Sequence, residues 1–244
     1  MKTLIIIPSR LSATRLPGKP LLKIAGLSMI SHVVKKAESA NIGEVFVAAE
    51  DQEIIDDVKK NGGQAILTSN HHKTGTDRIF EAINKLGKLD AELIINLQGD
   101  EPLIGIKDIK KLHNAMIQSK PKIGTLASNI LEKNVLKNQS LVKVITKESL
   151  NESNFPEAKD FKREVTTDIK NIYHHLGLYC YQFEILKKFI LLRQSLNEIK
   201  NKLEQLRALD NHIKINVSLA KESSIGVDTE EDFVAIKKIM EYKV

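Results

Sequence analysis

The sequence predicts an α/β protein with a mixed, mainly parallel sheet and helices on both faces. Short apolar runs recur along the first half of the chain, at 3–8, 44–49 and 91–97. Segments whose apolar residues repeat with the helical period of 3.6 separate these runs. A chain of 244 residues is also long enough to bury a large core. Buried strands that alternate with amphipathic helices indicate a parallel sheet covered on both sides.

The first half of the chain predicts strictly alternating strands and helices. Ser28 is expected to open a helix, since Met29, Ile30, Val33, Val34 and Ala37 follow it on one face. Gly62 and Gly63 are expected to end the next helix. In chain order, the expected elements are a strand at 3–8, a helix from Ser28, a strand at 44–49, a helix at 51–60, a strand at 64–67, a helix from about Thr76 and a strand at 91–97.

The second half is less regular. Strands are expected at 122–130, 141–146, 174–182 and 213–219, and helices at 183–192, 196–209 and 229–242. The polar segment 147–171 is interpreted as a surface loop or an excursion at a subunit contact. Because no repeat, low-complexity tract or linker interrupts the chain, we expect one domain over 1–244.

Composition narrows the class of protein. The net charge is +6, but lysines are scattered among acids, aromatic residues make up only 5% and Trp is absent. A nucleic-acid-binding protein more often clusters its cations or interleaves them with stacking aromatics. Cys180, alone in the chain, excludes an internal disulfide and is expected to be buried. Without a signal-peptide cleavage site or an apolar span, the chain is expected to be cytoplasmic.

The segment 9–22 carries the strongest functional signal. It reads S-R-L-S-A-T-R-L-P-G-K-P-L-L directly after the first predicted strand, and it holds Arg10, Arg15 and Lys19. Ligands of open α/β sheets bind where loops leave the carboxyl ends of parallel strands. Three cations there, two of them among only six arginines in the chain, indicate a polyanion such as a nucleoside triphosphate. Neither a Walker-type phosphate loop nor a dinucleotide fingerprint is present, so side chains must hold the phosphates.

Two acidic loops are candidates for a metal site. Asp100 follows the strand at 91–97 within N-L-Q-G-D-E-P, and Asp228 lies in G-V-D-T-E-E-D. Mg²⁺ typically takes one or two carboxylates together with phosphates and water. Asp100 could instead serve only a turn, and Asp228 or Thr229 could simply cap the last helix.

Three further motifs have weaker signals. The first motif is T-G-T-D-R, from Thr74 to Arg78, which places a glycine and hydroxyls at the expected start of a helix. Backbone N–H groups at a helix start can bind a nucleotide. An ordinary first helical turn would have the same residue types. Of His174 and His175, one could contact substrate while the other is structural. Glu204 and Gln205, in L-E-Q-L-R, could reach a sugar or merely face solvent.

Taken in order, these motifs resemble those of the 3-deoxy-manno-octulosonate (Kdo) cytidylyltransferase family, the CMP-Kdo synthetases of lipopolysaccharide assembly. The resemblance covers essentially the full length and rests on six fragments: R-L-S-A-T-R-L-P-G-K-P-L, T-G-T-D-R, N-L-Q-G-D-E-P, H-L-G-L-Y-C-Y, L-E-Q-L-R and G-V-D-T. It implies the nucleotide-diphospho-sugar transferase (glycosyltransferase A-like) fold, CTP and Mg²⁺ as ligands, and a homodimer whose contacts lie within 147–212.

The resemblance also implies roles for single residues. Arg10, Arg15 and Lys19 would bind the CTP phosphates, with Lys19 and Arg10 catalytic, and Asp100 and Asp228 would hold Mg²⁺. Two further sets complete the site: Gly75, Thr76 and Arg78 at the nucleotide, and Gln98, His175, Tyr179, Glu204 and Gln205 at the sugar.

One departure from the family pattern bears on the sugar. Glu152 stands where the family usually has an arginine, and the following loop lacks the family's W-D-R-D. Kdo is therefore the expected acceptor, with 8-amino-Kdo or a sialic acid as alternatives. A sugar-phosphate nucleotidyltransferase is a weaker fit because the chain lacks G-x-G-T-R-L. A non-enzymatic nucleotide or RNA binder is a rival of another class, and its affinity would fall steeply with salt.

Overall fold

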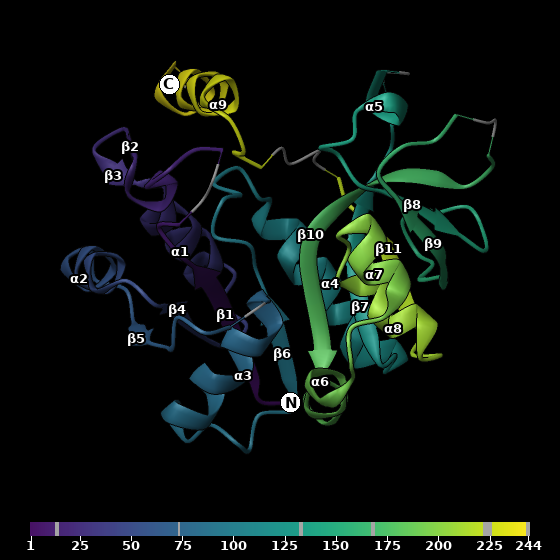
Figure 1. The fold of residues 1–244 in the computed structure, drawn as a ribbon, viewed down its shortest axis with the longest axis horizontal. Coiled ribbons are helices and arrows are strands. Elements are labelled where there is room, and N and C mark those ends of the chain that lie inside the picture. The colour runs from purple at the N-terminus through teal and green to yellow at the C-terminus, as the bar shows by residue number, and fades with distance from the viewer. Residues whose placement is uncertain (13–14, 73, 132–133, 167–168, 222–225, 243–244) are drawn as a thin grey trace. The chain divides into compact units, whose positions relative to one another are not determined.

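A computed structural model describes residues 1–12, 15–72, 74–131, 134–166, 169–221 and 226–242. Packing divides the chain into two units, Met1–Ile109 with Ser224–Val244, and Lys110–Ser223. The expectation of one domain over 1–244 stays a prediction. Figure 1 shows the elements of each unit. No described helix has both the length and the apolar character needed to span a bilayer.

The first unit is built on a parallel sheet. Its strands lie in the order β6-β1-β4-β5, and every pair is parallel. β1 is central, and its residues Leu4 to Ile7 are completely buried, as continuous apolar strands in a covered sheet should be. The bounds are β1 (Thr3–Ser9), β4 (Glu44–Ala49), β5 (Ala65–Leu67) and β6 (Leu93–Asn96).

Helices of the first unit begin where the sequence places capping residues. Ser28 accepts a hydrogen bond from the Ser31 N–H, and Thr74 accepts one from the Asp77 N–H, at 3.3 and 3.2 Å. Gly62, with φ of 86°, follows the second helix in the left-handed region. The elements are the short helix η1 (Lys19–Leu21), the hairpin β2 (Lys23–Ile24) and β3 (Leu27–Ser28), then α1 (Met29–Ser39), α2 (Gln52–Lys60), α3 (Gly75–Leu86) and α9 (Glu230–Tyr242).

The second unit has a mixed sheet. β7 pairs in parallel with β11 and antiparallel with β10, which continues antiparallel to β8 and then β9. The elements are β7 (Ile123–Ser128), α5 (Asn134–Lys137), β8 (Lys143–Thr146), β9 (Ala158–Lys162), β10 (Ile172–Gln182), α6 (Phe183–Leu191), α7 (Leu196–Asn201), α8 (Gln205–Asp210) and β11 (Ile215–Leu219). The α/β class with a mainly parallel sheet is therefore confirmed.

Two expectations need correction, and one helix was not expected. The helix expected over 196–209 is two helices, because Lys202 adopts a left-handed conformation with φ of 52° and ends α7. The segment 147–171 contains a strand, β9, rather than only loop, while 167–168 within it lie outside the described residues. The helix α4 (Ile106–Ser119) was not expected, although Ile109, Leu112 and Met116 repeat with helical spacing and are fully buried.

Candidate active site

A shared hydrophobic cluster fixes the two loops on which the predicted site depends. Leu16 lies in the cation loop, which is the segment 9–22 with its three predicted phosphate-binding cations. Val227 directly precedes Asp228. Both Leu16 and Val227 pack with the buried Met29 and Phe233. The Val227 N–H also donates to the Asp100 carbonyl at 2.9 Å. Apolar burial therefore fixes the backbone beneath the charged side chains of the first unit, although more than two hundred residues separate the two loops in sequence.

Lys19 joins the two predicted metal ligands. Its Nζ lies 2.6 Å from Asp100 Oδ2 and 3.5 Å from Asp228 Oδ1, and it donates to the Val227 carbonyl at 2.8 Å. The Lys19 side chain is only 15% exposed, and the two carboxylates are 29% and 34% exposed. The two carboxylates therefore face one cation position in a partly dry environment, where charge interactions are stronger than in bulk water.

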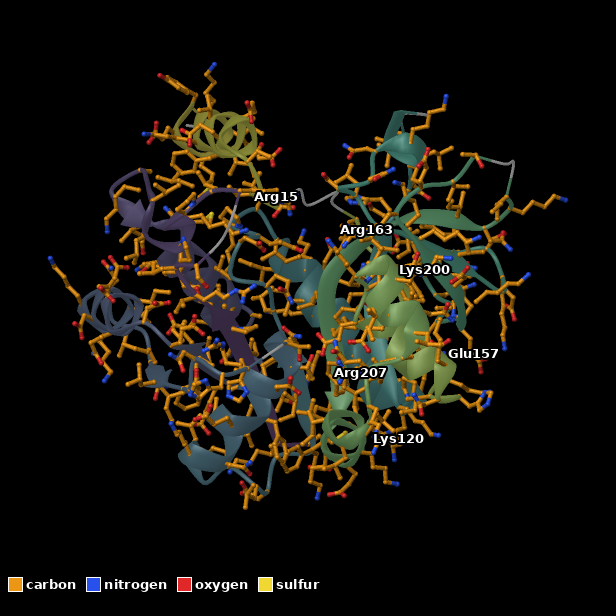
Figure 2. All side chains as sticks on the ribbon, viewed as in Figure 1. Arg15, Lys120, Glu157, Arg163, Lys200 and Arg207 are labelled. Carbon is orange, nitrogen blue, oxygen red and sulfur yellow. The ribbon has the colours of Figure 1, made fainter. Side chains whose placement is uncertain are left out.

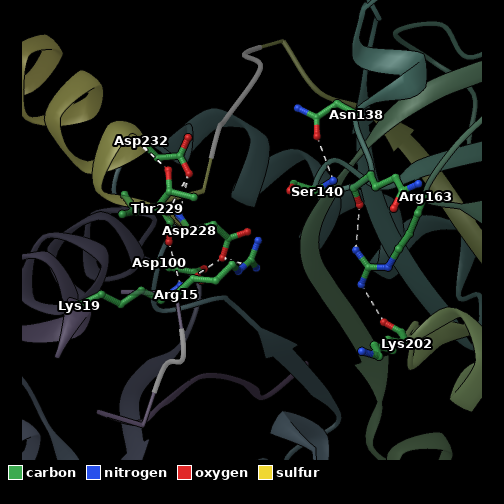
Figure 3. Close-up of polar contacts among 12 residues, drawn as sticks. Arg15, Lys19, Asp100, Asn138, Ser140, Arg163, Lys202, Asp228, Thr229 and Asp232 are labelled. Atoms are coloured by element: carbon green, nitrogen blue, oxygen red, sulfur yellow. Dashed lines mark hydrogen bonds and ion pairs between the residues drawn. The ribbon is translucent and has the colours of Figure 1, made fainter. Parts of the chain in front are cut away.

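Asp228 is free to serve the site because the helix cap is made by its neighbours (Figure 3). The Asp232 N–H donates to Thr229 Oγ1 at 3.2 Å, and Asp232 Oδ2 accepts from the N–H groups of Thr229 and Asp228 at 2.9 and 3.0 Å. Thr229 and Asp232 thus form a reciprocal cap. The Asp228 carboxylate points away from that cap to Arg15 NH2 at 3.0 Å and to Lys19.

Asp100 is placed by a close approach of two loops. A Cβ on Gly99 would lie 3.0 Å from Ile30 Cδ1 and 3.3 Å from the Pro8 carbonyl, so a larger residue there would push the turn away from the end of β1. Glycine therefore lets the loop after β6 reach the carboxyl end of β1, where the cation loop begins.

The cation loop and the two loops that carry Asp100 and Asp228 line a cavity of about 340 Å³ in the first unit. Its wall includes Arg10, Arg15, Lys19, Gly75, Arg78, Gln98, Asp100 and Asp228. The structure therefore brings together eight of the nine predicted site residues of this unit. The ninth, Thr76, is buried in the first turn of α3 and is not part of the wall.

Arg78 is engaged by the protein itself. Its guanidinium pairs with the Glu50 carboxylate and donates to Thr68 Oγ1 at 2.7 Å and to the Ser69 carbonyl at 3.2 Å. Its side chain is 4% exposed. Arg78 thus fixes the loop that follows β5 against α3, and it borders the cavity as part of a buried ion pair.

The remaining predicted sugar residues lie in the second unit. The rings of His175 and Tyr179 are 5.3 Å apart, and His175 Nε2 lies 3.0 Å from Thr125 Oγ1. Burial, and to a smaller extent the neighbouring His174, lowers the pKa of His175 to about 3, so its ring is neutral at pH 7. Burial raises the pKa of Tyr179, as do Tyr181 and the nearby Glu204. Glu204 is the N-cap of α8 and Gln205 is its first residue, and both are half-buried.

An ion pair beneath this cluster explains the arginine of L-E-Q-L-R. Arg207, labelled in Figure 2, donates from Nε and NH2 to both Glu198 oxygens at 2.8 and 2.5 Å. Its guanidinium also lies 4.8 Å from the centre of the Phe189 ring. The pair is almost completely buried and holds α8 against α7. Arg207 therefore helps to hold α8, at whose start Glu204 and Gln205 lie, against α7.

Sequence reasoning did not single out three residues at or near the cavity: Glu50, His72 and Glu81. Glu50 pairs with Arg78, while His72 lines the cavity and contacts Glu81. The signal for His72 was its position just before T-G-T-D-R, but its partner on α3 could not be read from spacing.

Cys180 is buried, which agrees with the expectation of a packing role.

Comparisons with known proteins agree on one family. A family model described as cytidylyltransferase matches residues 4–215. A 3-deoxy-manno-octulosonate cytidylyltransferase from Thermodesulfovibrio yellowstonii is 41% identical, with 98% of each chain covered. The protein of that name from Rhodopseudomonas palustris is 40% identical, again over 98% of each chain. A solved CMP:2-keto-3-deoxy-manno-octonic acid synthetase complexed with CTP is 33% identical over all of both chains, with a TM-score of 0.89.

Proposed function

The chain belongs to the cytidylyltransferase family, and we propose that it transfers CMP from CTP to 3-deoxy-D-manno-octulosonate, releasing pyrophosphate and CMP-Kdo for lipopolysaccharide synthesis. The observation that carries this proposal is the convergence of Lys19, Arg15, Asp100 and Asp228 on one cavity. Relatives that share about 40% of their residues with this chain over almost its whole length have the name of this activity.

The reaction is a nucleotidyl transfer. The anomeric hydroxyl oxygen of Kdo attacks the α-phosphorus of CTP, the bond from that phosphorus to the bridging oxygen breaks, and pyrophosphate leaves with its electrons. The hydroxyl proton passes to solvent. Such transfers need little covalent help from protein, so placement and charge neutralisation supply most of the catalysis. Arg10, Arg15 and Lys19 hold the triphosphate, and Lys19 and Arg10 neutralise the leaving pyrophosphate.

The donor set fits Mg²⁺. Asp100 and Asp228 present two carboxylates to one cation position, which the Lys19 ammonium shares. No group of three or more His, Cys, Asp or Glu side chains suited to a metal occurs among the described residues. Two carboxylates completed by phosphate oxygens and water are the usual Mg²⁺ arrangement. When bound, Mg²⁺ would neutralise charge on the phosphates. With the ion held by Asp100 and Asp228, Lys19 would be released to contact the nucleotide.

We propose that the sugar acid is bound by Gln98, His175, Tyr179, Glu204 and Gln205, as the resemblance implies. The Tyr179 hydroxyl supports this, since it is buried and finds no hydrogen-bond partner among the described residues. A ligand hydroxyl would satisfy it.

Kdo remains the proposed acceptor despite Glu152. A hydrogen bond from Lys111, at 2.7 Å, and the charge of that lysine lower the pKa of Glu152. Lys111 therefore compensates much of the charge that Glu152 introduces. We propose 8-amino-Kdo and sialic acid as poorer acceptors.

We propose that the enzyme works in the cytoplasm as a homodimer. The α6–α7 segment supports a subunit contact within 147–212, because Leu191, Leu196 and Ile199 are 80%, 87% and 57% exposed. Apolar side chains concentrated in this way often mark protein interfaces. Light scattering on the purified chain should give a mass of two subunits, and Leu196→Glu should give one.

One assay tests the activity. Pyrophosphate release from CTP and Mg²⁺ is measured with Kdo, 8-amino-Kdo and a sialic acid, and product is identified by mass. Turnover should be fastest with Kdo and should yield CMP-Kdo. Equal or faster turnover with either other sugar would reject the proposed acceptor, and no release with any sugar would reject the proposed activity.

A further inference from the structure

Asp51 stands at the start of a helix but does not cap that helix. It directly precedes α2 in the extended conformation of an N-cap, and aspartate is among the best capping residues. Its side chain nevertheless accepts no hydrogen bond from α2, all of which the structure describes. Ser28 and Thr74, at the starts of α1 and α3, do accept such bonds from their own helices. The Asp51 side chain therefore serves something other than α2.

The Asp51 carboxylate contacts the cation loop instead. Its Oδ2 accepts a hydrogen bond from the Leu11 N–H at 2.7 Å, in a partly buried position. The two residues follow β4 and β1, which pair in parallel as far as Ala49 and Ser9. The hydrogen bond thus continues the contact between these two segments beyond the end of the sheet.

Leu11 is also held through its carbonyl group. That carbonyl accepts a hydrogen bond from the Gly18 N–H at 3.1 Å, which closes the cation loop on itself. Gly18 has a φ of 70°, in the left-handed region that glycine adopts readily, and it directly precedes Lys19. Two successive hydrogen bonds therefore connect Asp51 to the backbone beside Arg10 and to the backbone beside Lys19.

Arg10 depends most on this anchor. Arg15 and Lys19 are oriented by ion pairs with Asp228 and Asp100, whereas Arg10 pairs with no acid in the described part of the chain. The Arg10 side chain is exposed and lines the cavity. Its position therefore follows from that of its backbone, which Asp51 holds at the next residue.

We propose that Asp51 is a positioning residue for nucleotide binding, which anchors the cation loop at Leu11 and so holds Arg10 and Lys19 in place before the triphosphate binds. The proposal rests on the proposed function, because it takes these two cations as phosphate ligands. A loop that already has its binding conformation loses less conformational freedom when the ligand arrives, so affinity rises with the fraction of molecules that hold it. This role also explains why Asp51 leaves α2 without a side-chain cap.

Calorimetric titration of the full-length protein with CTP and Mg²⁺ tests the proposal through two substitutions of one residue. Asp51→Ser introduces another good capping residue, but its hydroxyl ends one bond short of the position of Oδ2. Asp51→Asn removes the charge and keeps an oxygen that can accept from Leu11. Asp56→Ser is the matched control, because Asp56 is exposed on the same helix and accepts from Gln52 of that helix. Urea unfolding compares the stability of the variants.

Asp51→Ser should weaken CTP binding about tenfold, because the loss of one hydrogen bond to a charged group amounts to at least the 1.4 kcal/mol that corresponds to this factor. Asp51→Asn and Asp56→Ser should bind CTP as wild type does. The urea midpoint of Asp51→Ser should not fall, since serine can supply the cap that Asp51 leaves unmade. In the pyrophosphate-release assay, the KM for CTP should rise in Asp51→Ser while the KM for Kdo stays the same.

Four results would overturn the proposal. The first is Asp51→Ser that binds CTP as tightly as wild type. The second is equal weakening in Asp51→Asn or in Asp56→Ser, which would assign the effect to charge or to α2 as a whole. The third is an equal rise in both KM values, and the fourth is Asp51→Ser that fails to fold or has a lower urea midpoint, since Asp51 would then serve the fold in general. Wild type that fails to bind CTP would reject the proposed function as well, whereas the other outcomes leave that function standing.

Discussion

Lys19→Met removes the cation that both acids of the site share. In the free protein, Lys19 Nζ contacts Asp100 Oδ2 at 2.6 Å, the Val227 carbonyl at 2.8 Å and Asp228 Oδ1 at 3.5 Å. Methionine keeps most of the apolar stem but donates nothing. Two carboxylates then face each other, and Asp228 keeps its ion pair with Arg15.

The expected loss of stability is modest. A hydrogen bond to a charged group contributes about 1.5–3 kcal/mol when it is sheltered from water. Asp100 and Asp228 are 29% and 34% exposed, so water replaces part of what Lys19 supplied. We therefore expect the free energy of unfolding to fall by about 1–2 kcal/mol in the absence of divalent ions. Turnover should fall by a factor of about 10²–10³, as for other lost charge contacts.

The decisive part of this prediction is the response to Mg²⁺. Without Lys19, the carboxylates bind the ion with no competitor, and ligand binding to the folded state stabilises it. At ten times its dissociation constant, Mg²⁺ would add about 1.4 kcal/mol to the free energy of unfolding. Urea unfolding with and without Mg²⁺ measures this increment, which should be larger in Lys19→Met than in wild type.

A matched control lies four residues away. Lys23 pairs with Asp57 at 2.9 Å on the surface of the same unit, and its side chain is 56% exposed. Lys23→Met should leave the Mg²⁺ increment unchanged. The reasoning is refuted if Lys19→Met gains no more from Mg²⁺ than wild type does, because Lys19 would then not compete for the metal position.

Three further predictions test other parts of the structure. Asp100→Ala and Asp228→Ala should each lower pyrophosphate release below detection at unchanged circular dichroism; near-normal release in either would remove that residue from the metal site. Arg207→Met should lower the free energy of unfolding by about 3–5 kcal/mol, because it leaves Glu198 buried without its ion pair. An unchanged urea midpoint would contradict this. Acid should destabilise the second unit through His175, whose pKa falls from 6.5 to about 3 on folding. Since the unfolded chain binds the proton more tightly, this stability is complete above pH 6.5 and is lost as the pH falls, by about 1.4 kcal/mol per pH unit. His175→Gln should flatten urea midpoints between pH 6.5 and 4.5, and an unchanged slope would exclude this role.

Local signals predicted much of the fold. Ser28 and Thr74 cap helices as their types suggest, and the apolar run at β1 became the central buried strand of the first unit. These features depend on neighbours in sequence, which spacing reveals. The break at Lys202 was not predictable in this way, because lysine has no preference for the left-handed region that it adopts there.

That the candidate site residues of the first unit lie close together was predictable for a similar reason. Arg15, Lys19 and Asp100 follow strands of one parallel sheet, whose carboxyl ends must meet at one edge. The partners of the charged groups were not predictable. Arg78 pairs with Glu50, and His72 contacts Glu81. Both contacts depend on how the loop after β5 folds against α3, and no periodic pattern in the sequence predicts the fold of a loop.

Anomalous diffraction from crystals grown with CTP and Mn²⁺ in place of Mg²⁺ tests the central claim most directly. We predict a manganese peak bonded to a carboxylate oxygen of both Asp100 and Asp228 and to a phosphate oxygen of CTP, with Lys19 Nζ moved from the acids to the triphosphate. A peak elsewhere, or CTP bound while Lys19 still bridges the two carboxylates, would contradict it.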